Sequence, residues 1–364
     1  MRQNRCRYAL ANFSGPWRVC LTFGACKRGL VASWSHARST CAPSAHHGAS
    51  ACKRGGVSGA KTALARLGER ARSKREAEFA RLFNVLASER GIVVHKGATY
   101  GPDARHRLDV YQADPRRNRN ARVLFVYGGG WRDGAREIYR FVGTALAAQG
   151  LTTIIPDYRL YPSARFPDFM EDAARAYGWA HAHRLADGPK PVVLMGHSAG
   201  AHIAALLALD PTYRMQFAPD APPPAGLVGL AGPYAFDPTT WSSTRDIFAP
   251  AAGHPDRARP VAHARADAPP SLLLYGRADD TVGRFNGQDF AGALSKAGAT
   301  ARLIEYGGVG HVGLVVAIGR GVRWRAPVLR DVLDFIDGLA RDACERTASP
   351  SEETPGMESS STSF

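Results

Sequence analysis

Three residue types that together support nucleophilic catalysis occur at separated points of the sequence. Ser198 is the centre of the pentapeptide GHSAG at 196–200, Asp279 ends the tetrapeptide GRAD at 276–279, and His311 follows a glycine-rich stretch. A serine hydroxyl is a weak nucleophile at neutral pH unless an imidazole takes its proton and a carboxylate holds the imidazole tautomer. The three side chains are therefore predicted to act together, with Ser198 as nucleophile, His311 as base and Asp279 as orienting acid.

Ser198 occupies a position where a strand is expected to meet a helix. The apolar run 191–195 precedes it, and the helix-favouring stretch 199–209 follows it. Small residues two positions before and two after a serine allow the tight turn that exposes its hydroxyl. The first helical turn then directs unpaired N–H groups and the positive end of the helix dipole at an oxyanion formed beside the serine.

Three consecutive glycines are expected to complete an oxyanion hole. The sequence YGGGW at 127–131 follows a predicted strand and offers a backbone free of side chains. Removing one backbone donor of this kind costs about 3–4 kcal/mol of transition-state stabilisation. We assign the N–H groups of Gly129, Gly130 and Ala199 to the hole, and the sequence leaves open which of the three glycines donates.

These residues need a scaffold, and eight short apolar stretches are predicted to be strands: 91–95, 107–111, 123–127, 151–155, 191–195, 225–230, 271–275 and 301–306. From the third strand onward most connections contain a helical stretch: 135–149, 166–185, 199–209, 284–297 and 326–341. The alternation predicts an α/β fold with a mostly parallel sheet covered on both faces, whereas the short loop between the first two strands predicts an antiparallel pair. A further helical face recurs at Phe79, Leu82, Phe83 and Leu86 and is ended by Gly91.

The predicted strands bring the chemistry to one edge of the sheet. The glycines follow the third strand, Ser198 the fifth, Asp279 the seventh and His311 the eighth. In an open α/β sheet, ligands bind outside the carboxyl ends of the strands. All four features are therefore expected at the same edge.

Charge divides the 364-residue chain into regions. Residues 1–75 hold 15 Lys and Arg against one acid, a net charge of +14, while the rest of the chain has a net charge of only +1. We expect a disordered basic leader at 1–75, a catalytic domain at 76–346 with a short cap insertion at 231–270, and a disordered polar tail at 347–364. The basicity thus belongs to the leader, and no nucleic-acid binding is expected of the catalytic domain.

The leader has the composition of an organellar transit peptide, and equally that of upstream sequence translated as protein. It contains five of the six cysteines, so the body needs no oxidising compartment and a cytoplasmic location is expected. The spacing of Cys41, His46, His47 and Cys52 is not that of a standard zinc site, and no metal or cofactor is predicted. No apolar stretch is long enough to span a membrane.

Taken in order, several motifs resemble those of one superfamily. They are YGGGW at 127–131, DYRL at 157–160 with Pro162 and FP at 166–167, GHSAG followed by AH at 201–202, GRADDTV at 276–282, and GH at 310–311. From about Phe83 to Arg341 the chain resembles the α/β-hydrolases, in particular the hormone-sensitive-lipase and arylformamidase-like carboxylesterases. The resemblance implies an eight-stranded α/β-hydrolase fold and metal-free hydrolysis of a carboxylic ester or similar acyl bond.

One position departs from this family. Tyr127 stands where the family commonly has a histidine that shapes the loop, and a hydrogen-bonding tyrosine is expected to substitute for it. For the acid, Asp280 is an alternative, although the family pattern Gly-x-x-Asp-x-x-Val favours Asp279. His197 and His202 flank the nucleophile and are expected to pack or hydrogen-bond, with a second base as the alternative.

Other residues near these motifs have two interpretations each. Asp157 and Arg159 suggest a buried ion pair beneath the active-site loops. Trp131, Trp241 and Phe248 are candidates to line an acyl pocket, and core packing is the alternative for each. The GxGxxG pattern at 308–313 matches a dinucleotide fingerprint, but it lies after the last strand instead of opening a βαβ unit.

The resulting hypothesis is a serine carboxylesterase that hydrolyses small or aromatic esters through an acyl-enzyme on Ser198. The alternatives are an arylformamidase or amide hydrolase with the same triad, and a non-catalytic binding protein that keeps the hydrolase scaffold. The expected partner is a small-molecule ester substrate, and the sequence carries no prediction of the oligomeric state.

Overall fold

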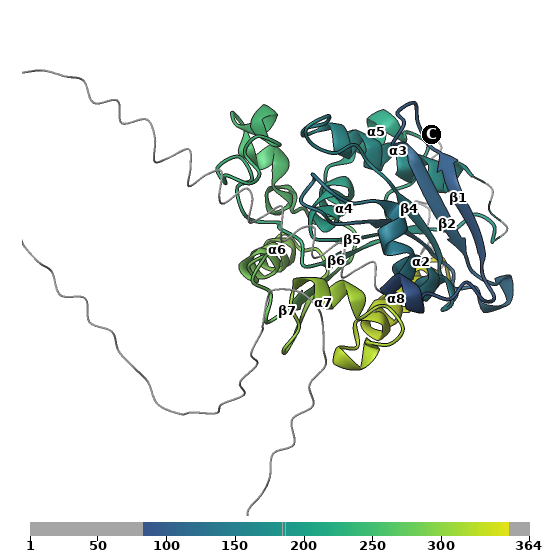
Figure 1. Cartoon of the computed structure of the whole chain (residues 1–364). Helices are drawn as coiled ribbons and strands as arrows, with labels where there is room; N and C mark the ends of the chain where they lie inside the picture. Colours follow the sequence, from purple (N-terminus) through teal and green to yellow (C-terminus); the bar gives the residue numbers. More distant parts are fainter. Residues whose placement is uncertain (1–82, 184, 186, 349–364) are drawn as a thin grey trace, which may run out of the picture. The chain divides into compact units, whose positions relative to one another are not determined.

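The computed structural model of the chain describes residues 83–183, 185 and 187–348 (Figure 1). The expected leader, the tail from residue 349 onward and the first part of the helical face around Phe79 and Leu82 lie outside these residues. The domain boundaries at 75 and 346 therefore stay predictions.

The described residues form an eight-stranded sheet, which confirms the expected α/β architecture. Its strands are β1 (Val93–Thr99), β2 (Arg107–Gln112), β3 (Arg122–Val126), β4 (Thr152–Pro156), β5 (Val192–His197), β6 (Gly226–Leu230), β7 (Ser271–Gly276) and β8 (Ala301–Tyr306). Their order across the sheet is β1-β2-β4-β3-β5-β6-β7-β8. β2 is antiparallel to both β1 and β4, and all other neighbours are parallel. The opening pair is therefore antiparallel, as expected.

The central strands are apolar because both of their faces are covered. Every residue of β3 and β5 is buried, as is typical of parallel strands between two helical layers. β3 and β5 are paired directly, with Phe125 opposite Met195 and Val126 opposite Gly196. This register places the chain that leaves β3 beside the chain that leaves β5.

Seven helices of α type accompany the sheet in the described part of the chain: α2 (Arg140–Ala147), α3 (Asp168–Ala182), α4 (Ala199–Leu209), α5 (Pro211–Phe217), α6 (Phe285–Lys296), α7 (His311–Val316) and α8 (Val328–Ala348). Figure 1 shows α2 and α8 on one side of the strands and α3 and α4 on the other. All of α4 is buried, which explains why its sequence is apolar around its whole circumference. Among the helices of these residues, none combines the length and apolar character that crossing a lipid bilayer requires.

Three details differ from the sequence expectations. The described part of the first helical face is one 3-10 turn, η1 (Asn84–Leu86), after which Ala87 is extended. The helices α5 and α7 were not predicted, because seven and six residues are too few for a periodic apolar pattern. The start of α5 nevertheless has a capping signature, since the carboxylate of Asp210 accepts from Thr212 N–H and proline follows it.

The connection 231–270 consists of irregular chain and three 3-10 turns, η4 (Ala249–Ala251), η5 (Pro255–Ala258) and η6 (Pro260–His263). Ile247 and Phe248 in this segment are fully buried. The N–H of Phe166 donates to the carbonyl of Ile247 at 3.0 Å, which ties the connection to the start of α3.

Candidate active site

Ser198 lies on a sharp turn between β5 and α4. Its backbone has φ 54° and ψ −124°, a conformation that residues with a side chain rarely adopt. The N–H of Ser198 donates to the carbonyl of Leu230 at 2.9 Å, so β6 helps to hold the turn. The turn projects the hydroxyl beyond the carboxyl end of the sheet.

The two glycines of GHSAG are required by close backbone contacts. A Cβ on Gly196 would lie 2.3 Å from the carbonyl oxygen of Gly200. A Cβ on Gly200 would lie 2.1 Å from the oxygen of Val126 and 2.4 Å from that of Tyr127. Only glycine allows α4 to start this close to the end of β3.

Ser198, His311 and Asp279 form a continuous chain of hydrogen bonds. The Nε2 of His311 is 2.9 Å from the Oγ of Ser198, and its Nδ1 is 2.8 Å from the Oδ2 of Asp279. The His311 side chain is 4% exposed and that of Asp279 is fully buried. The structure thus brings together the three residues that the sequence analysis selected, although they are up to 113 positions apart in sequence.

Backbone groups fix the acid in this chain. The Oδ1 of Asp279 accepts from the N–H groups of Thr281 and Val282, each at 2.9 Å, which leaves Oδ2 for His311. Burial alone would raise the pKa of Asp279, but the hydrogen bond and charge of His311, with the two N–H donors, hold it below its ordinary value. Asp280, the alternative acid, instead accepts from the hydroxyl of Thr281.

The glycine loop after β3 passes directly against the turn at Ser198. A Cβ on Gly128 would lie 2.9 Å from the Cβ of Ser198. Gly129 and Gly130 have φ 141° and 60°, values that an L-residue with a side chain adopts only with strain. Within the described residues, no hydrogen bond to protein occupies the N–H groups of Gly129, Gly130 or Ala199. These three donors are therefore available beside Ser198.

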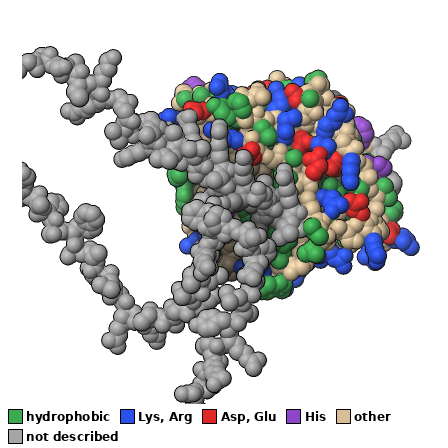
Figure 2. Space-filling model, in the orientation of Figure 1, with side chains coloured by type: hydrophobic (Ala, Val, Ile, Leu, Met, Phe, Trp, Pro, Cys, Tyr) green, Lys and Arg blue, Asp and Glu red, His purple; other side chains and the backbone are tan. Residues whose placement is uncertain are grey.

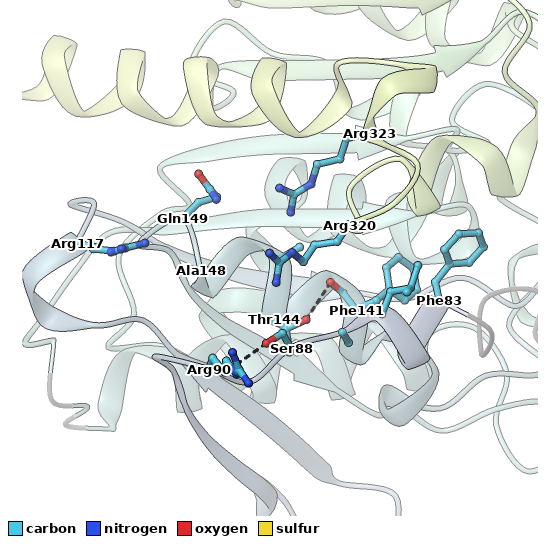
Figure 3. A pocket seen from close by; sticks show the side chains of 13 residues that line it. Phe83, Ser88, Arg90, Arg117, Phe141, Thr144, Ala148, Gln149, Arg320 and Arg323 are labelled. Atoms are coloured by element: carbon cyan, nitrogen blue, oxygen red, sulfur yellow. Dashed lines mark hydrogen bonds between the residues drawn. The ribbon is translucent and has the colours of Figure 1, made fainter.

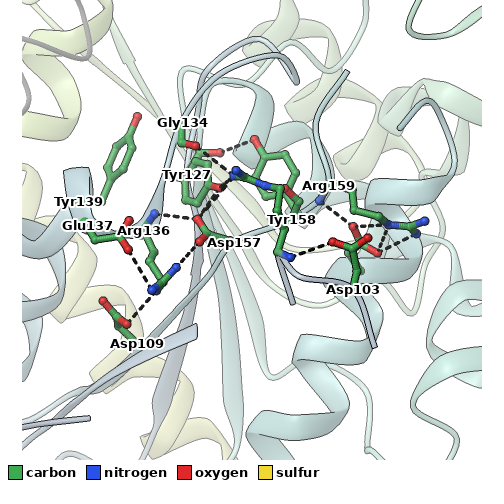
Figure 4. Close-up of polar contacts among 12 residues, drawn as sticks. Asp103, Asp109, Tyr127, Gly134, Arg136, Glu137, Tyr139, Asp157, Tyr158 and Arg159 are labelled. Carbon is green, nitrogen blue, oxygen red and sulfur yellow. Dashed lines mark hydrogen bonds and ion pairs between the residues drawn. The ribbon is translucent and has the colours of Figure 1, made fainter. Parts of the chain in front are cut away.

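Tyr127 anchors the start of this loop (Figure 4). Its hydroxyl donates to the Oδ1 of Asp157 at 2.7 Å and accepts from the Nη2 of Arg105 at 2.9 Å. Its ring lies so close to Gly134 that a Cβ there would be 2.5 Å from the ring. Burial and the charge of Asp157 raise the pKa of Tyr127, so the phenol stays protonated as a donor. The tyrosine thus fixes both ends of the loop 127–134.

Arg136 extends the network behind the loop. Its guanidinium pairs with Asp157 and with the Oδ1 of Asp109, the latter at 2.8 Å, and its N–H donates to Asp157 at 2.9 Å. Asp109 lies on β2 and Asp157 follows β4, so the network joins two strands to the loop. Arg105, Asp109 and Arg136 were not predicted as part of the site, because none of them belongs to a motif. Asp109 could have been noticed in the sequence, because it is a charged residue inside a predicted strand.

The expected ion pair between Asp157 and Arg159 is wrong. Arg159 instead forms an ion pair with Asp172 of α3 at 2.8 Å, and its backbone N–H donates to the same carboxylate at 2.7 Å. Asp172 also contacts the ring of His106 at 2.8 Å. Residues two apart leave a loop in different directions, which explains why Asp157 and Arg159 join separate networks (Figure 4).

The two histidines beside the nucleophile have structural contacts. The Nε2 of His197 is 3.2 Å from the carbonyl oxygen of His311, and burial, with the nearby His311, lowers the pKa of His197 to about 3. The Nε2 of His202 is 2.8 Å from the carbonyl oxygen of Ala258, and burial lowers its pKa to about 4. Both rings are therefore neutral at pH 7 and donate from Nε2.

The three candidate pocket aromatics have different environments. Trp131 and Phe248 are 4% and 0% exposed and pack edge to face, with ring centres 5.0 Å apart. Trp241 is 58% exposed and packs against Phe236. Trp131 and Phe248 are core residues, which was the alternative interpretation for each. Of the three aromatic residues, Trp241 alone has a side chain that a substrate can contact without rearrangement of the protein.

No group of three or more metal-binding side chains occurs within the part of the chain that the structure describes. The glycine pattern at 308–313 encloses His311, and α7, which begins at that histidine, is only six residues long. This geometry gives no long helix whose N-terminus could face a dinucleotide.

Comparison with known proteins is consistent with this arrangement. The profile of the BD-FAE family matches residues 108–218, a stretch that contains Tyr127, the three glycines and Ser198. A probable isoprenylcysteine alpha-carbonyl methylesterase of Oryza sativa is 28% identical over 280 residues, covering 70% of this chain and 66% of the relative. Esterase LipC of Mycobacterium tuberculosis is 29% identical over 243 residues, covering 61% and 60% respectively. The chain thus matches less than two thirds of the length of either relative.

Solved structures resemble the fold over longer stretches. Esterase B from Lactobacillus rhamnosis superposes with a TM-score of 0.66 at 18% identity and covers 79% of this chain and 99% of its own. A truncated carbohydrate esterase from gut microbiota gives a TM-score of 0.60 at 17% identity, covering 70% of this chain and 99% of that chain. At these identities the likeness establishes the fold alone.

Proposed function

Because the chain is a member of the α/β-hydrolase superfamily and its relatives are named as ester hydrolases, we propose that it is a serine carboxylesterase. It hydrolyses small or aromatic carboxylic esters through an acyl-enzyme on Ser198. The observation that carries this proposal is the chain of hydrogen bonds from the Ser198 hydroxyl through His311 to Asp279, beside backbone N–H groups that no described residue occupies. The names of the relatives favour ester hydrolysis over the formamidase and non-catalytic hypotheses.

In the first step, the Oγ of Ser198 attacks the acyl carbon while its proton passes to the Nε2 of His311. The carbonyl oxygen becomes an oxyanion, which accepts hydrogen bonds from Ala199 N–H and from Gly129 or Gly130. His311, now an imidazolium, donates its Nε2 proton to the alkoxide that departs as alcohol. Water then adds to the acyl-enzyme by the same route, and the carboxylic acid and free Ser198 are released.

Asp279 supports both steps without accepting a proton. Because its pKa lies below the ordinary value, it is ionised at neutral pH. Its fixed contact with Nδ1 keeps the Nε2 lone pair toward Ser198 and stabilises the imidazolium that forms.

Substrate selection is assigned to the connection 231–270. The guanidinium of Arg132, in the glycine loop, donates to the carbonyl of Ser243 at 2.8 Å, which supports a position of this connection beside the oxyanion donors. Trp241 is two residues away and exposed, so we assign it to the ester's aromatic or small acyl group. Trp131 and Phe248 act indirectly, by packing beneath the loop.

Cysteine use supports a cytoplasmic location, because beyond the leader the chain has a single cysteine, Cys344. This location, like the small-molecule ester as partner, belongs to the proposal.

The proposal is tested with nitrophenyl acetate and a fluorophosphonate probe on the purified full chain. We expect turnover with that ester, and one probe per chain on Ser198. Ser198→Ala should lose both, whereas Ser295→Ala, which changes an exposed serine of α6, should keep both. Full activity in Ser198→Ala, or faster turnover of N-formylkynurenine than of the ester, would contradict the proposal.

A further inference from the structure

One cavity of the described chain is lined by none of the proposed catalytic residues. Its volume is about 390 Å³, and its walls come from η1, α2 and the chain around residues 320–323. Arg117 and Gln149 in its lining lie just before the amino ends of β3 and β4, whereas Ser198 follows a carboxyl end. The cavity therefore opens near the opposite edge of the sheet from the proposed active site, and the esterase mechanism makes no use of it.

The lining combines an apolar floor with positive charge. Phe141 and Ala145 of α2 contribute to the floor, and the polar side chains of Thr144 and Gln149 lie beside them. Four arginines complete the lining: Arg90, Arg117, Arg320 and Arg323. In Figure 3, Arg320 and Arg323 extend from one segment toward Gln149, while Arg90 and Arg117 come from other parts of the chain. We call this the arginine cavity.

Among the side chains that the structure describes, no carboxylate balances the positive charge of the arginine cavity. No acidic side chain is among its described lining residues, and none of its four guanidinium groups lies within ion-pair distance of a described carboxylate. The Nε of Arg323 donates to the carbonyl of Ile318 at 3.0 Å, and burial together with Arg320 lowers the pKa of Arg323. Elsewhere, Figure 2 shows basic and acidic side chains interspersed on the visible described surface. The cavity is thus built to receive an anion.

Exposed apolar side chains belong to, or directly adjoin in sequence, the lining residues Leu86 and Arg323. Trp324, Val85 and Leu86 are 81%, 78% and 51% exposed. Trp324 donates from its indole nitrogen to the carbonyl of Gly321 at 3.1 Å, and a Cβ on Gly321 would be 2.8 Å from the Cδ1 of Leu86. Leu86 and Trp324 therefore both lie against Gly321. Exposed tryptophan beside arginine is typical of surfaces that enter a membrane interface.

We propose that the arginine cavity binds the phosphate headgroup of an anionic phospholipid, while Trp324, Val85 and Leu86 enter the interfacial layer of the bilayer. A free phosphate compound would bind to the arginines, but its binding would not explain why Trp324, next to Arg323, is so exposed. The sequence also favours an anionic surface as the partner, because residues 1–75, which precede the cavity-lining Phe83 in the chain, carry a net charge of +14. The protein would thus associate peripherally with an anionic membrane surface.

The test measures binding of the full chain to vesicles of phosphatidylglycerol and phosphatidylcholine, against vesicles of phosphatidylcholine alone. Each basic residue near an anionic bilayer contributes about fivefold in affinity. We therefore expect Arg117→Gln/Arg320→Gln to bind roughly 25-fold more weakly. Lys296→Gln/Arg302→Gln, which removes the same charge from exposed positions outside the cavity, should bind as the wild type does. Trp324→Ala should weaken binding by roughly tenfold.

Two results would overturn the proposal. One is equal vesicle binding by Arg117→Gln/Arg320→Gln and the wild type, which would assign membrane binding to the leader alone. The other is binding of soluble glycerol 3-phosphate that depends on Arg117 and Arg320 but not on Trp324, which would make the cavity a site for a free phosphate compound. Hydrolysis of a soluble nitrophenyl ester should be unchanged in all these variants, so failure here is distinguishable from failure of the proposed esterase function.

Discussion

Replacing Ser198 with glycine should stabilise the protein relative to replacing it with alanine. Ser198 has φ 54° and ψ −124°, a region that glycine enters without steric cost and that alanine, with its Cβ, does not. Both substitutions remove the hydroxyl and its contact with His311. Their difference therefore isolates the backbone strain at the turn.

The size of the effect follows from two opposing contributions. A non-glycine residue in such a conformation costs about 1–3 kcal/mol. Glycine gives back about 0.4–1 kcal/mol, because it increases the conformational entropy of the unfolded chain. Ser198→Gly should thus exceed Ser198→Ala by about 0.5–2 kcal/mol in the free energy of unfolding, which corresponds to roughly 1–8 °C in the midpoint of thermal unfolding.

Urea and thermal unfolding, followed by circular dichroism on both variants, provide the measurement. Neither variant should hydrolyse nitrophenyl acetate, which confirms that the compared proteins lack the same function. If Ser198→Gly is no more stable than Ser198→Ala, the turn is not strained and the reasoning is refuted.

Three further predictions concern the acid, a neighbouring histidine and a glycine. Asp279→Asn should lower kcat by about 10³–10⁴-fold, because it favours the wrong tautomer of the base. Because the pKa of Asp279 is lowered in the folded state, the contribution of this carboxylate to stability should be complete above the ordinary carboxyl pKa. It should disappear as the pH falls through the folded-state value, which urea unfolding at a series of pH values will measure. Burial lowers the pKa of His202 to about 4, so between about pH 6.5 and pH 4 the unfolded chain binds one proton more than the folded chain. The free energy of unfolding therefore falls as the pH decreases. His202→Gln should reduce the slope of this fall by about 1.4 kcal/mol per pH unit between pH 6.5 and 4. Gly200→Ala should destabilise by about 1–3 kcal/mol because its Cβ meets the carbonyl of Val126 at 2.1 Å, whereas Gly292→Ala, in α6 with open space around its Cβ, should stabilise by about 0.5–1 kcal/mol; equal unfolding midpoints for the two glycine variants would contradict this.

The elements that sequence predicted best are those whose apolar pattern is unbroken. Each of the eight strands was expected within a few residues of its position, because strands buried on both faces read as continuous apolar runs. The short helices α5 and α7 were not, since a helix of two turns is specified by its caps and tertiary contacts more than by periodicity.

The candidate site shows the same division. Ser198, Asp279 and His311 could be selected because each follows a predicted strand, and parallel strands end at one edge. The partners of Asp157 could not, since Arg105 and Arg136 reach it through long side chains from loops whose course no local pattern specifies. The wrong pairing of Asp157 with Arg159 came from treating closeness in sequence as closeness in space.

The sheet order has a consequence for how loss of activity should be interpreted. Ser198, Asp279 and His311 depend on β5, β7 and β8, while β1 lies at the far edge, with three strands between it and β5. Fraying of that edge would leave the hydrolytic groups in register, whereas any opening between β5 and β8 would separate them. Residual activity in a partly denatured sample would therefore report the integrity of one half of the sheet, while spectroscopic signals would average over all eight strands.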